Sequence, residues 1–326
     1  MMATKNTEIV KDAISTVDIA TSGKLSPEQA KVFIDYMHKE TEIFDMIQFK
    51  RMKQLHGIAY DISMARRMLR KGLEGTEPTN YSSIKTGQNE IDLIETILAT
   101  DITDQFKIEN VEGPKAADHI MRLVAQQYSN DLQDLAINGN TDAQNTDPAA
   151  ADYFNVTDAE LEFLKIYDGW LKLIKENEGK HMVEETFSPD VGYKGLLKTA
   201  LKAMPERWKK GGDLLYLVPY EVIEDYVYEL TGRVSTMGDN ALLNDKNPIT
   251  FMGRKLVGVS AMPSNTALLT SPSNLAFGIY TENIKTEYER NARKRQDEYT
   301  TTSFTGVQIA NYDAAVLMTW EESSGS

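Results

Sequence analysis

The stretch that decides the fold runs from Gly113 to Trp170 and contains two blocks: GPKAADHIMRLVAQQYSNDLQDLAING, residues 113–139, and KIYDGWLK, residues 165–172. The first block opens on Gly-Pro, which suits a helix start, and ends on Asn138-Gly139, which is typical of a helix end. It predicts one helix of roughly 24 residues, about 36 Å long. Apolar residues at helical spacing predict a single buried stripe along this helix: Ile120, Leu123, Val124, Tyr128, Leu132 and Leu135.

The polar residues of the same block are expected to face water: Arg122, Gln126, Asn130, Gln133 and Asp134. Residues 140–155 are small or turn-forming and predict a surface loop. The apolar residues between 161 and 174 then follow a helical period that ends near Glu178-Gly179. Trp170 lies within this second helical segment, and we interpret it as a core residue.

Composition excludes several classes of protein. The 326 residues include no cysteine, so disulfides, thiolate catalysis and cysteine-ligated metals are absent. A net charge of −14 argues against tight, sequence-specific nucleic-acid binding, which needs clustered Lys and Arg. No run of eighteen apolar residues is present, and residues 1–11 lack the apolar core of a signal peptide. We therefore expect that the protein does not associate with a membrane and is not secreted through a recognisable signal peptide.

One segment has the opposite charge from the rest of the chain. Residues 50–71 contain a single acid, Asp61, and seven basic residues: Lys50, Arg51, Lys53, Arg66, Arg67, Arg70 and Lys71. The polar stretch that follows has too few apolar residues to form a core of its own. An apolar pattern typical of a buried strand begins again at Leu93. A solvated face is one interpretation of the basic residues. A nucleic-acid patch is weaker, because Tyr60 is the lone aromatic residue there.

From Tyr193 onward the pattern predicts a layer of alternating helices and strands. Residues 196–204 predict a helix that Pro205 stops, and residues 219–231 predict a second helix. The apolar strand 214–218 is expected to be buried on both faces and to share one sheet with 255–259, 267–269, 275–280 and 314–320. Residues 284–309 alternate polar and apolar side chains, which predicts a long antiparallel ribbon returning beside the long helix.

Several blocks, in this order, resemble the major capsid proteins of tailed double-stranded DNA phages. They are DGWLK at 168–172, AMPERW at 203–208, LLYLVP at 214–219, MGRKLVGV at 252–259 and LLTSPSNLAFGI at 268–279. The resemblance covers about residues 50–320 and implies the α+β Hong Kong 97-type capsid fold. Its expected parts are an N-terminal arm at 1–49, an extended loop at 50–92, a peripheral domain with spine helix and β-ribbon at 93–195, an axial domain at 196–275, and return strands at 276–326.

The resemblance also implies a function. The chain would be a self-assembling, non-enzymatic subunit of an icosahedral head shell, forming pentamers and hexamers around DNA that it does not bind sequence-specifically. The extended loop would lie over a neighbouring subunit, so the seven basic residues of segment 50–71 become candidate intersubunit contacts with an acidic surface. A separate scaffolding protein, a portal and minor head proteins are implied partners. The implied location is the virion, after assembly in the bacterial host cytoplasm.

Two alternative functions remain open from the sequence. An encapsulin-like nanocompartment shell shares the fold. A metal-free enzyme would need paired carboxylates, such as Glu184 with Glu185, or Asp118 with Asp131 or Asp134. No nucleotide, metal or hydrolase motif is present, and the four histidines lie far apart, so we expect no cofactor and no metal. The basic cluster at 290–295 is interpreted as a solvated turn or an intersubunit salt-bridge site.

Overall fold

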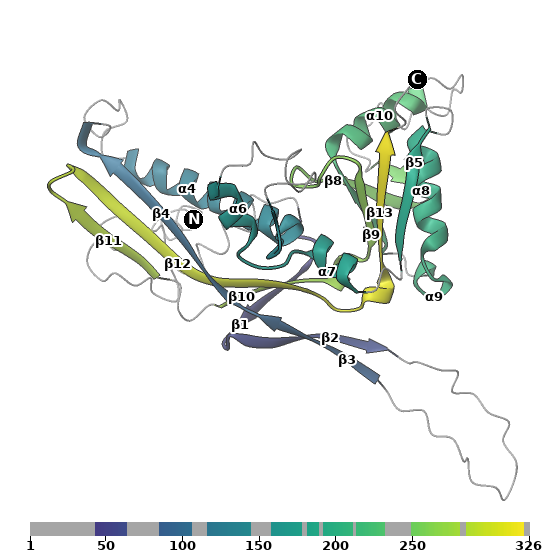
Figure 1. Cartoon of the computed structure of the whole chain (residues 1–326), viewed down its shortest axis with the longest axis horizontal. Helices are drawn as coiled ribbons and strands as arrows, with labels where there is room; N and C mark the ends of the chain where they lie inside the picture. Colours follow the sequence, from purple (N-terminus) through teal and green to yellow (C-terminus); the bar gives the residue numbers. More distant parts are fainter. Residues whose placement is uncertain are drawn as a thin grey trace, which may run out of the picture.

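The structure, a computed structural model, describes residues 43–63, 85–105, 116–144, 158–177, 181–188, 192–210, 213–231, 249–280 and 285–322. Figure 1 shows three parts: an elongated layer of one long helix on a ribbon of strands, a compact layer of helices on a second sheet, and a two-stranded hairpin that projects from the body. In the described ranges, no helix combines the length and apolar character needed to cross a membrane.

The predicted long helix is α4 (Ala116–Asn138), which ends where the sequence indicates. Gly139 follows it and donates its backbone N–H to Leu135 O at 2.9 Å. A Cβ at Gly139 would collide with the backbone oxygen of Tyr167, so a larger residue cannot occupy this close crossing. The helix end is therefore fixed by a chain crossing as well as by local preference.

The buried arc of α4 differs from the predicted stripe. Tyr128, Leu132 and Leu135 are buried as expected, but Leu123 is 51% exposed and Gln133 is 3% exposed. The packing partners of this helix include the ribbon, through strand β12 (Gln296–Ile309), and, near the C-terminal end, α7 (Trp170–Glu176). Because the second partner covers a neighbouring face, the buried arc at that end is wider than one apolar stripe.

A five-stranded sheet supports α4. Its order is β1–β10–β12–β11, and β4 also pairs with β12. The strands are β1 (Gln48–Met52), β4 (Ile94–Thr103), β10 (Leu275–Tyr280), β11 (Lys285–Asn291) and β12 (Gln296–Ile309). Alternate residues of β12 are buried, and the Tyr128 hydroxyl of α4 contacts Ser303 Oγ. The predicted return of the ribbon to the long helix is thus present.

A six-stranded sheet forms the compact layer, in the order β5–β13–β9–β6–β8–β7. The strands are β5 (Met182–Phe187), β6 (Leu215–Val218), β7 (Thr250–Phe251), β8 (Arg254–Gly258), β9 (Thr266–Thr270) and β13 (Ala315–Glu322). Every residue of β6 is buried, as its unbroken apolar run predicts. Tyr216 and Val218 pack with the helices α8 (Gly192–Ala203) and α10 (Tyr220–Thr231), while Leu215 and Leu217 join the core beneath α4 and α7.

The placement of 275–280 in this sheet was wrong. The segment forms β10 of the five-stranded sheet, parallel to β1 and antiparallel to β12. A short 3₁₀ turn, Pro272–Asn274, carries the chain from β9 into the other sheet, and a second, Tyr312–Ala314, carries it back before β13. Asn274 joins the two crossings, because its amide donates to Asn311 O at 2.9 Å and its Oδ1 accepts from Asn311 N at 2.8 Å.

The helical period between 161 and 174 is split into two helices. They are α6 (Asp158–Leu164) and α7, and residues 165–169 between them are not helical. Asp168 in the break accepts hydrogen bonds from the backbone N–H and the hydroxyl of Thr141, both at 2.8 Å, and Gly169 N donates to Gly139 O at 2.8 Å. Trp170 is 1% exposed, so its core role is confirmed.

Candidate assembly surfaces

The hairpin that leaves the body is the first candidate surface. Strands β2 (His56–Ser63) and β3 (Lys85–Asp92) pair in antiparallel register with each other and with no other described strand. Its root is packed: Ala59 and Ile91 are fully buried beside Ala276 of β10. Figure 1 shows the two strands extending from this root away from both sheets. An isolated two-stranded hairpin has little stability of its own, so this element is suited to contact a neighbour.

Hydrogen bonds hold the hairpin root in place. The Asn89 amide donates to Ile309 O at 2.5 Å, and the Gln308 amide donates to Glu90 O at 2.7 Å. A Cβ at Gly306 would collide with Asp92 O, so the end of β12 lies directly against the end of β3. The direction of the hairpin is therefore fixed by the five-stranded sheet.

Three of the seven predicted basic contact residues lie at this root. Lys50 and Arg51 belong to β1, and Lys53 follows it as an exposed residue. Lys50 Nζ donates to Ile58 O at 3.0 Å, and partial burial lowers its pKa. Lys50 thus has an intrachain role between β1 and β2. The other four, Arg66, Arg67, Arg70 and Lys71, lie outside the described residues, so the grouping of the seven stays a prediction.

The second candidate surface is the face of the β4–β12–β11 ribbon that points away from α4. The strand register places Asp101 opposite Glu298, and Glu298 opposite Glu289, so three carboxylates form one row across three strands. Like charges directly opposite each other destabilise a sheet. Glu95 and Glu287 lie on the same face, and both are exposed. We call these five residues the acidic ribbon face.

This face also carries an exposed apolar residue, Ile97, at 65% exposure between Glu95 and Asp101 of β4. Sequence reasoning recognised the alternation in 284–309 but missed the acidic row. The alternating acids Glu287 and Glu289 were the available signal. Their alignment with Asp101, almost two hundred residues earlier, depends on strand register, which the sequence pattern alone does not supply.

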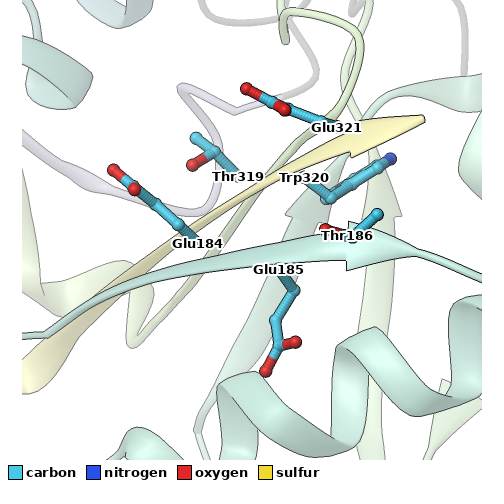
Figure 2. A pocket seen from close by; sticks show the side chains of 6 residues that line it. All are labelled: Glu184, Glu185, Thr186, Thr319, Trp320 and Glu321. Carbon is cyan, nitrogen blue, oxygen red and sulfur yellow. The ribbon is translucent and has the colours of Figure 1, made fainter. Parts of the chain in front are cut away.

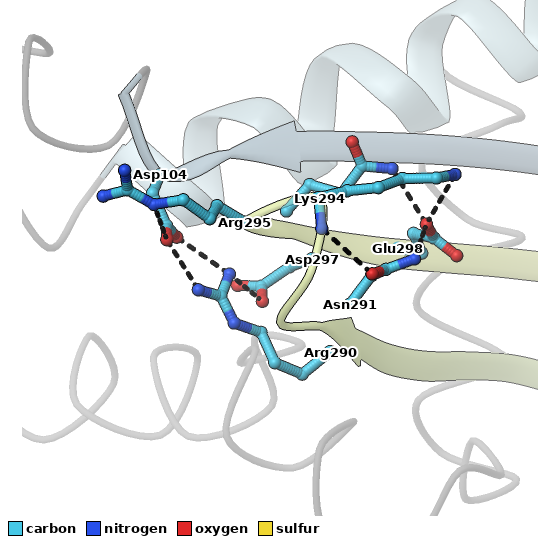
Figure 3. A network of polar contacts seen from close by, with 8 residues as sticks. Asp104, Arg290, Asn291, Lys294, Arg295, Asp297 and Glu298 are labelled. Carbon is cyan, nitrogen blue, oxygen red and sulfur yellow. Dashed lines mark hydrogen bonds and ion pairs between the residues drawn. The ribbon is translucent and has the colours of Figure 1, made fainter.

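The basic cluster at 290–295 forms the turn between β11 and β12 (Figure 3). A turn was one of the two interpretations of this cluster from the sequence. Arg290 donates to both carboxylate oxygens of Asp104, at 2.8 and 2.6 Å, and to Asp297 at 2.9 Å. Lys294 lies 3.4 Å from Glu298, and hydrogen bonds led by that of Gln296 lower the pKa of Glu298. Much of this charge is therefore matched within the chain, on the ribbon's own turn.

Of the carboxylate pairs considered for enzymatic chemistry, Glu184 with Glu185 does not bring two carboxylates together. Glu184 and Glu185 are neighbours on β5 and point to opposite faces of the strand, beside a hollow of about 520 Å³ that Figure 2 shows. Asp131 and Asp134 each accept a hydrogen bond from an amide of the same helix, Gln127 at 2.7 Å and Asn138 at 2.6 Å. The side chain of Asp118 is outside the described part. No group of three potential metal ligands occurs among the described residues.

Comparisons with known proteins agree with this arrangement. The chain is 22% identical over 310 residues to a Bacillus subtilis (strain 168) protein named "Putative prophage capsid protein YqbE", covering 89% of this chain and 91% of that protein. Among solved structures, a chain of the satellite phage P4 procapsid has a TM-score of 0.69 at 12% identity, covering 99% of this chain and all of the other. The chain has a phage capsid fold.

Further capsids share this fold at lower similarity. Gordonia phage Cozz gives a TM-score of 0.57 at 12% identity over 86% of both chains, and the capsid of the native GTA particle gives 0.58 at 9% identity over 86% of this chain and 90% of the other. No protein-family model matches the chain. The α+β capsid fold expected from the sequence is therefore confirmed, whereas the division into arm, loop and domains at the stated boundaries stays a prediction.

Proposed function

We propose that this chain is the structural subunit of an icosahedral phage head shell that encloses double-stranded DNA. The observation that carries the proposal is the match to a procapsid chain over essentially the full length of both proteins. The projecting hairpin supports it, because an element with so little intrachain packing gains its stability from a neighbour. The role is assembly, with no catalytic step.

The proposed partners follow from that role. Copies of the chain associate in pentamers and hexamers, with a separate scaffolding protein, a portal and minor head proteins. Assembly takes place in the host cytoplasm and the product is the virion. A net charge of −14 suits a shell that encloses DNA without binding it tightly, since binding to DNA phosphates needs clustered cations.

The proposed contact pairs the basic segment of the extended loop with the acidic ribbon face of a neighbouring copy. Residues 64–71, MARRMLRK, combine Arg66, Arg67, Arg70 and Lys71 with apolar residues. The ribbon face combines five carboxylates with exposed Ile97, so charge and apolar character are complementary. Within the chain, Lys294 lies 3.4 Å from Glu298, and cations from a neighbour would offset the remaining repulsion along the row of Asp101, Glu298 and Glu289.

Geometry favours a neighbouring copy over the same chain. Strand β2 has eight residues, so it spans about 26 Å from His56 to Ser63, the last described residue before the basic segment. Figure 1 shows the hairpin and the β11–β12 turn extending in different directions from the body. The described part of the hairpin therefore points away from the acidic ribbon face of its own chain.

Assembly is tested by expressing the protein alone and with its neighbouring genes. Light scattering after size-exclusion chromatography and negative-stain microscopy are expected to show rings or shells. Particles filled with DNA after coexpression distinguish a phage head from a nanocompartment that packages protein. A monomer under both conditions contradicts the proposed function.

The loop contact is tested by reversing Arg66, Arg67, Arg70 and Lys71 to glutamate. We expect particles to disappear while circular dichroism of the subunit is unchanged, because exposed single charges contribute little to intrachain stability. Adding Asp101→Lys, Glu287→Lys and Glu289→Lys in the same chain should restore assembly. Particles from the first variant, or failure of the second to recover them, would remove this pairing from the shell.

A further inference from the structure

Two neighbouring helices of the six-stranded layer carry opposite charge. Helix α8, GYKGLLKTALKA, contains three lysines and no acid. Helix α10, YEVIEDYVYELT, contains four acids and no basic residue. Both pack on the same face of the sheet, where Leu197 of α8 and Tyr226 of α10 share one core with Tyr216 of β6.

The chain itself uses this complementarity at one point. Lys194 Nζ lies 3.0 Å from a carboxylate oxygen of Glu229 and 5.9 Å from the centre of the Tyr226 ring, in the seam between the two helices. Glu229 also accepts the backbone N–H of Tyr193 at 2.8 Å, at the start of α8. Lys194 and Glu229 are therefore part of the intrachain packing.

The remaining charges form two solvent-facing stripes. On α10, Glu221, Glu224, Asp225 and Tyr228 are exposed, and Tyr228 is 78% exposed. On α8, Lys198 and Lys202 lie one turn apart and are both exposed. Within the described part of the chain, no ion pair joins these lysines to the three acids. We call the two sets the acidic stripe and the lysine stripe.

The stripes lie toward opposite ends of the sheet. Helix α8 contacts β5 and β13, which begin the strand order, whereas α10 contacts β8 near the other end. Each subunit thus presents one acidic and one basic helix at different ends of the same layer. Surfaces that are complementary to each other, but not to themselves, associate head to tail, and such a contact forms a ring when the rotation between successive copies closes.

We propose that the acidic stripe of one subunit binds the lysine stripe of the next subunit in the same ring. This inference rests on the proposed shell function and assigns a contact that is independent of the hairpin. Tyr228 lies at the C-terminal end of the acidic stripe and supplies a large, amphipathic contact area of the kind that dominates protein interfaces. Single exposed ion pairs contribute little, so the contact acts through repetition around the ring.

The first test is a charge exchange. Glu221→Lys, Glu224→Lys and Asp225→Lys together, or Lys198→Glu and Lys202→Glu together, are each expected to lower particle yield at least tenfold, with unchanged circular dichroism. All five changes in one chain should recover assembly, because the two stripes are then complementary again. Lys165→Glu with Lys175→Glu, two exposed lysines on other elements, is the matched control and should assemble normally. Unchanged yield in both reversals, or no recovery in the five-fold variant, overturns the proposal.

The second test uses the absence of cysteine from the chain. Lys202→Cys and Glu224→Cys single variants, mixed before assembly and treated with a short bis-maleimide, should give a crosslinked dimer that neither variant gives alone. The double variant should give a ladder beyond the dimer on denaturing gels. A ladder that stops at the dimer indicates a two-fold contact, and no crosslink indicates separated stripes; either result overturns head-to-tail pairing.

The outcomes separate this inference from the proposed function. Wild-type protein that forms rings or shells while the charge exchange has no effect refutes the helix contact and leaves the shell function intact. Wild-type protein that stays monomeric with its neighbouring genes refutes both.

Discussion

The two faces of the β4–β12–β11 ribbon have the same strands but opposite character. Toward α4, Thr96, Ser303 and the Tyr128 hydroxyl form a buried hydrogen-bonded group, with Thr96 Oγ1 at 2.8 Å from Ser303 Oγ. Away from α4, Asp101, Glu298 and Glu289 form a row of like charge. The inner face thus contributes to the folding of the subunit, whereas the outer face concentrates like charge and is the face for which we propose contact with a neighbouring copy.

The largest loss of subunit stability is expected from a substitution in the core beneath the inner face. Trp170 shares that core with Val307 of β12, and truncating a buried tryptophan to alanine typically costs about 3 to 5 kcal/mol. Trp170→Ala should lower the thermal midpoint of the free subunit and its soluble yield. In a variant without Trp208 and Trp320, Trp170 fluorescence should be blue-shifted and poorly quenched by iodide. A red-shifted, quenchable signal would contradict its burial.

The next effect concerns a charge on the helix that covers the inner face. Burial raises the pKa of Asp134 from 3.8 to about 6, and nearby Asp131 adds to it. Because the folded-state pKa is above the unfolded one, this carboxyl favours folding in acid, and its contribution is lost as the pH rises through about 6. Asp134→Asn should raise the free energy of unfolding at pH 7.5 by up to about 3 kcal/mol and have little effect at pH 4.

Urea unfolding of the free subunit at both pH values measures this difference, and Asp101→Asn on the outer face is the control. The side chain of Asp101 is exposed, so this substitution removes no charge from a buried site. Equal pH dependence of the two variants would contradict the burial of Asp134.

A smaller effect breaks the hydrogen-bonded group itself. Ser303→Ala removes one hydrogen-bond partner of both Thr96 and Tyr128, which keep their contact with each other at 3.1 Å, so the expected loss is that of net hydrogen bonds, about 0.5 to 1.5 kcal/mol. Tyr128→Phe should cost less in the Ser303→Ala background than in the wild type, since one of the partners of its hydroxyl is already gone. Additive losses in a double-mutant cycle would show that the residues act independently.

The smallest change in subunit stability is expected from a substitution on the outer face, where folding and assembly should respond in opposite directions. Glu289→Gln removes one charge from the acidic row and should stabilise the free subunit slightly, by about 0.2 to 1 kcal/mol, because cross-strand repulsion falls. Assembly, measured as particle yield against salt concentration, should weaken. A variant that is less stable and assembles normally would mean that the row serves folding.

Part of the fold could be predicted from residues close together in sequence. The unbroken apolar run of β6, the end of α4 at Gly139 and the stop of α8 before Pro205 depend on local pattern and backbone preference, and all three are present. The split between α6 and α7 was missed because Asp168 and Gly169 bond to Thr141 and Gly139 across the loop. The helical spacing of apolar residues within 161–174 contains no information about these hydrogen-bond partners, which lie in another part of the sequence.

By itself, the sequence determined the fold class, the absence of cysteine chemistry, the long helix and the segregation of basic charge into one segment. Only the tertiary structure decided that β10 leaves the sheet of β9, that Leu123 is exposed, and that Asp101, Glu298 and Glu289 align. The physical reason is that periodicity sets which face of an element is apolar, whereas strand register and helix crossing depend on residues far apart in the chain. Surfaces for assembly arise from that second kind of information.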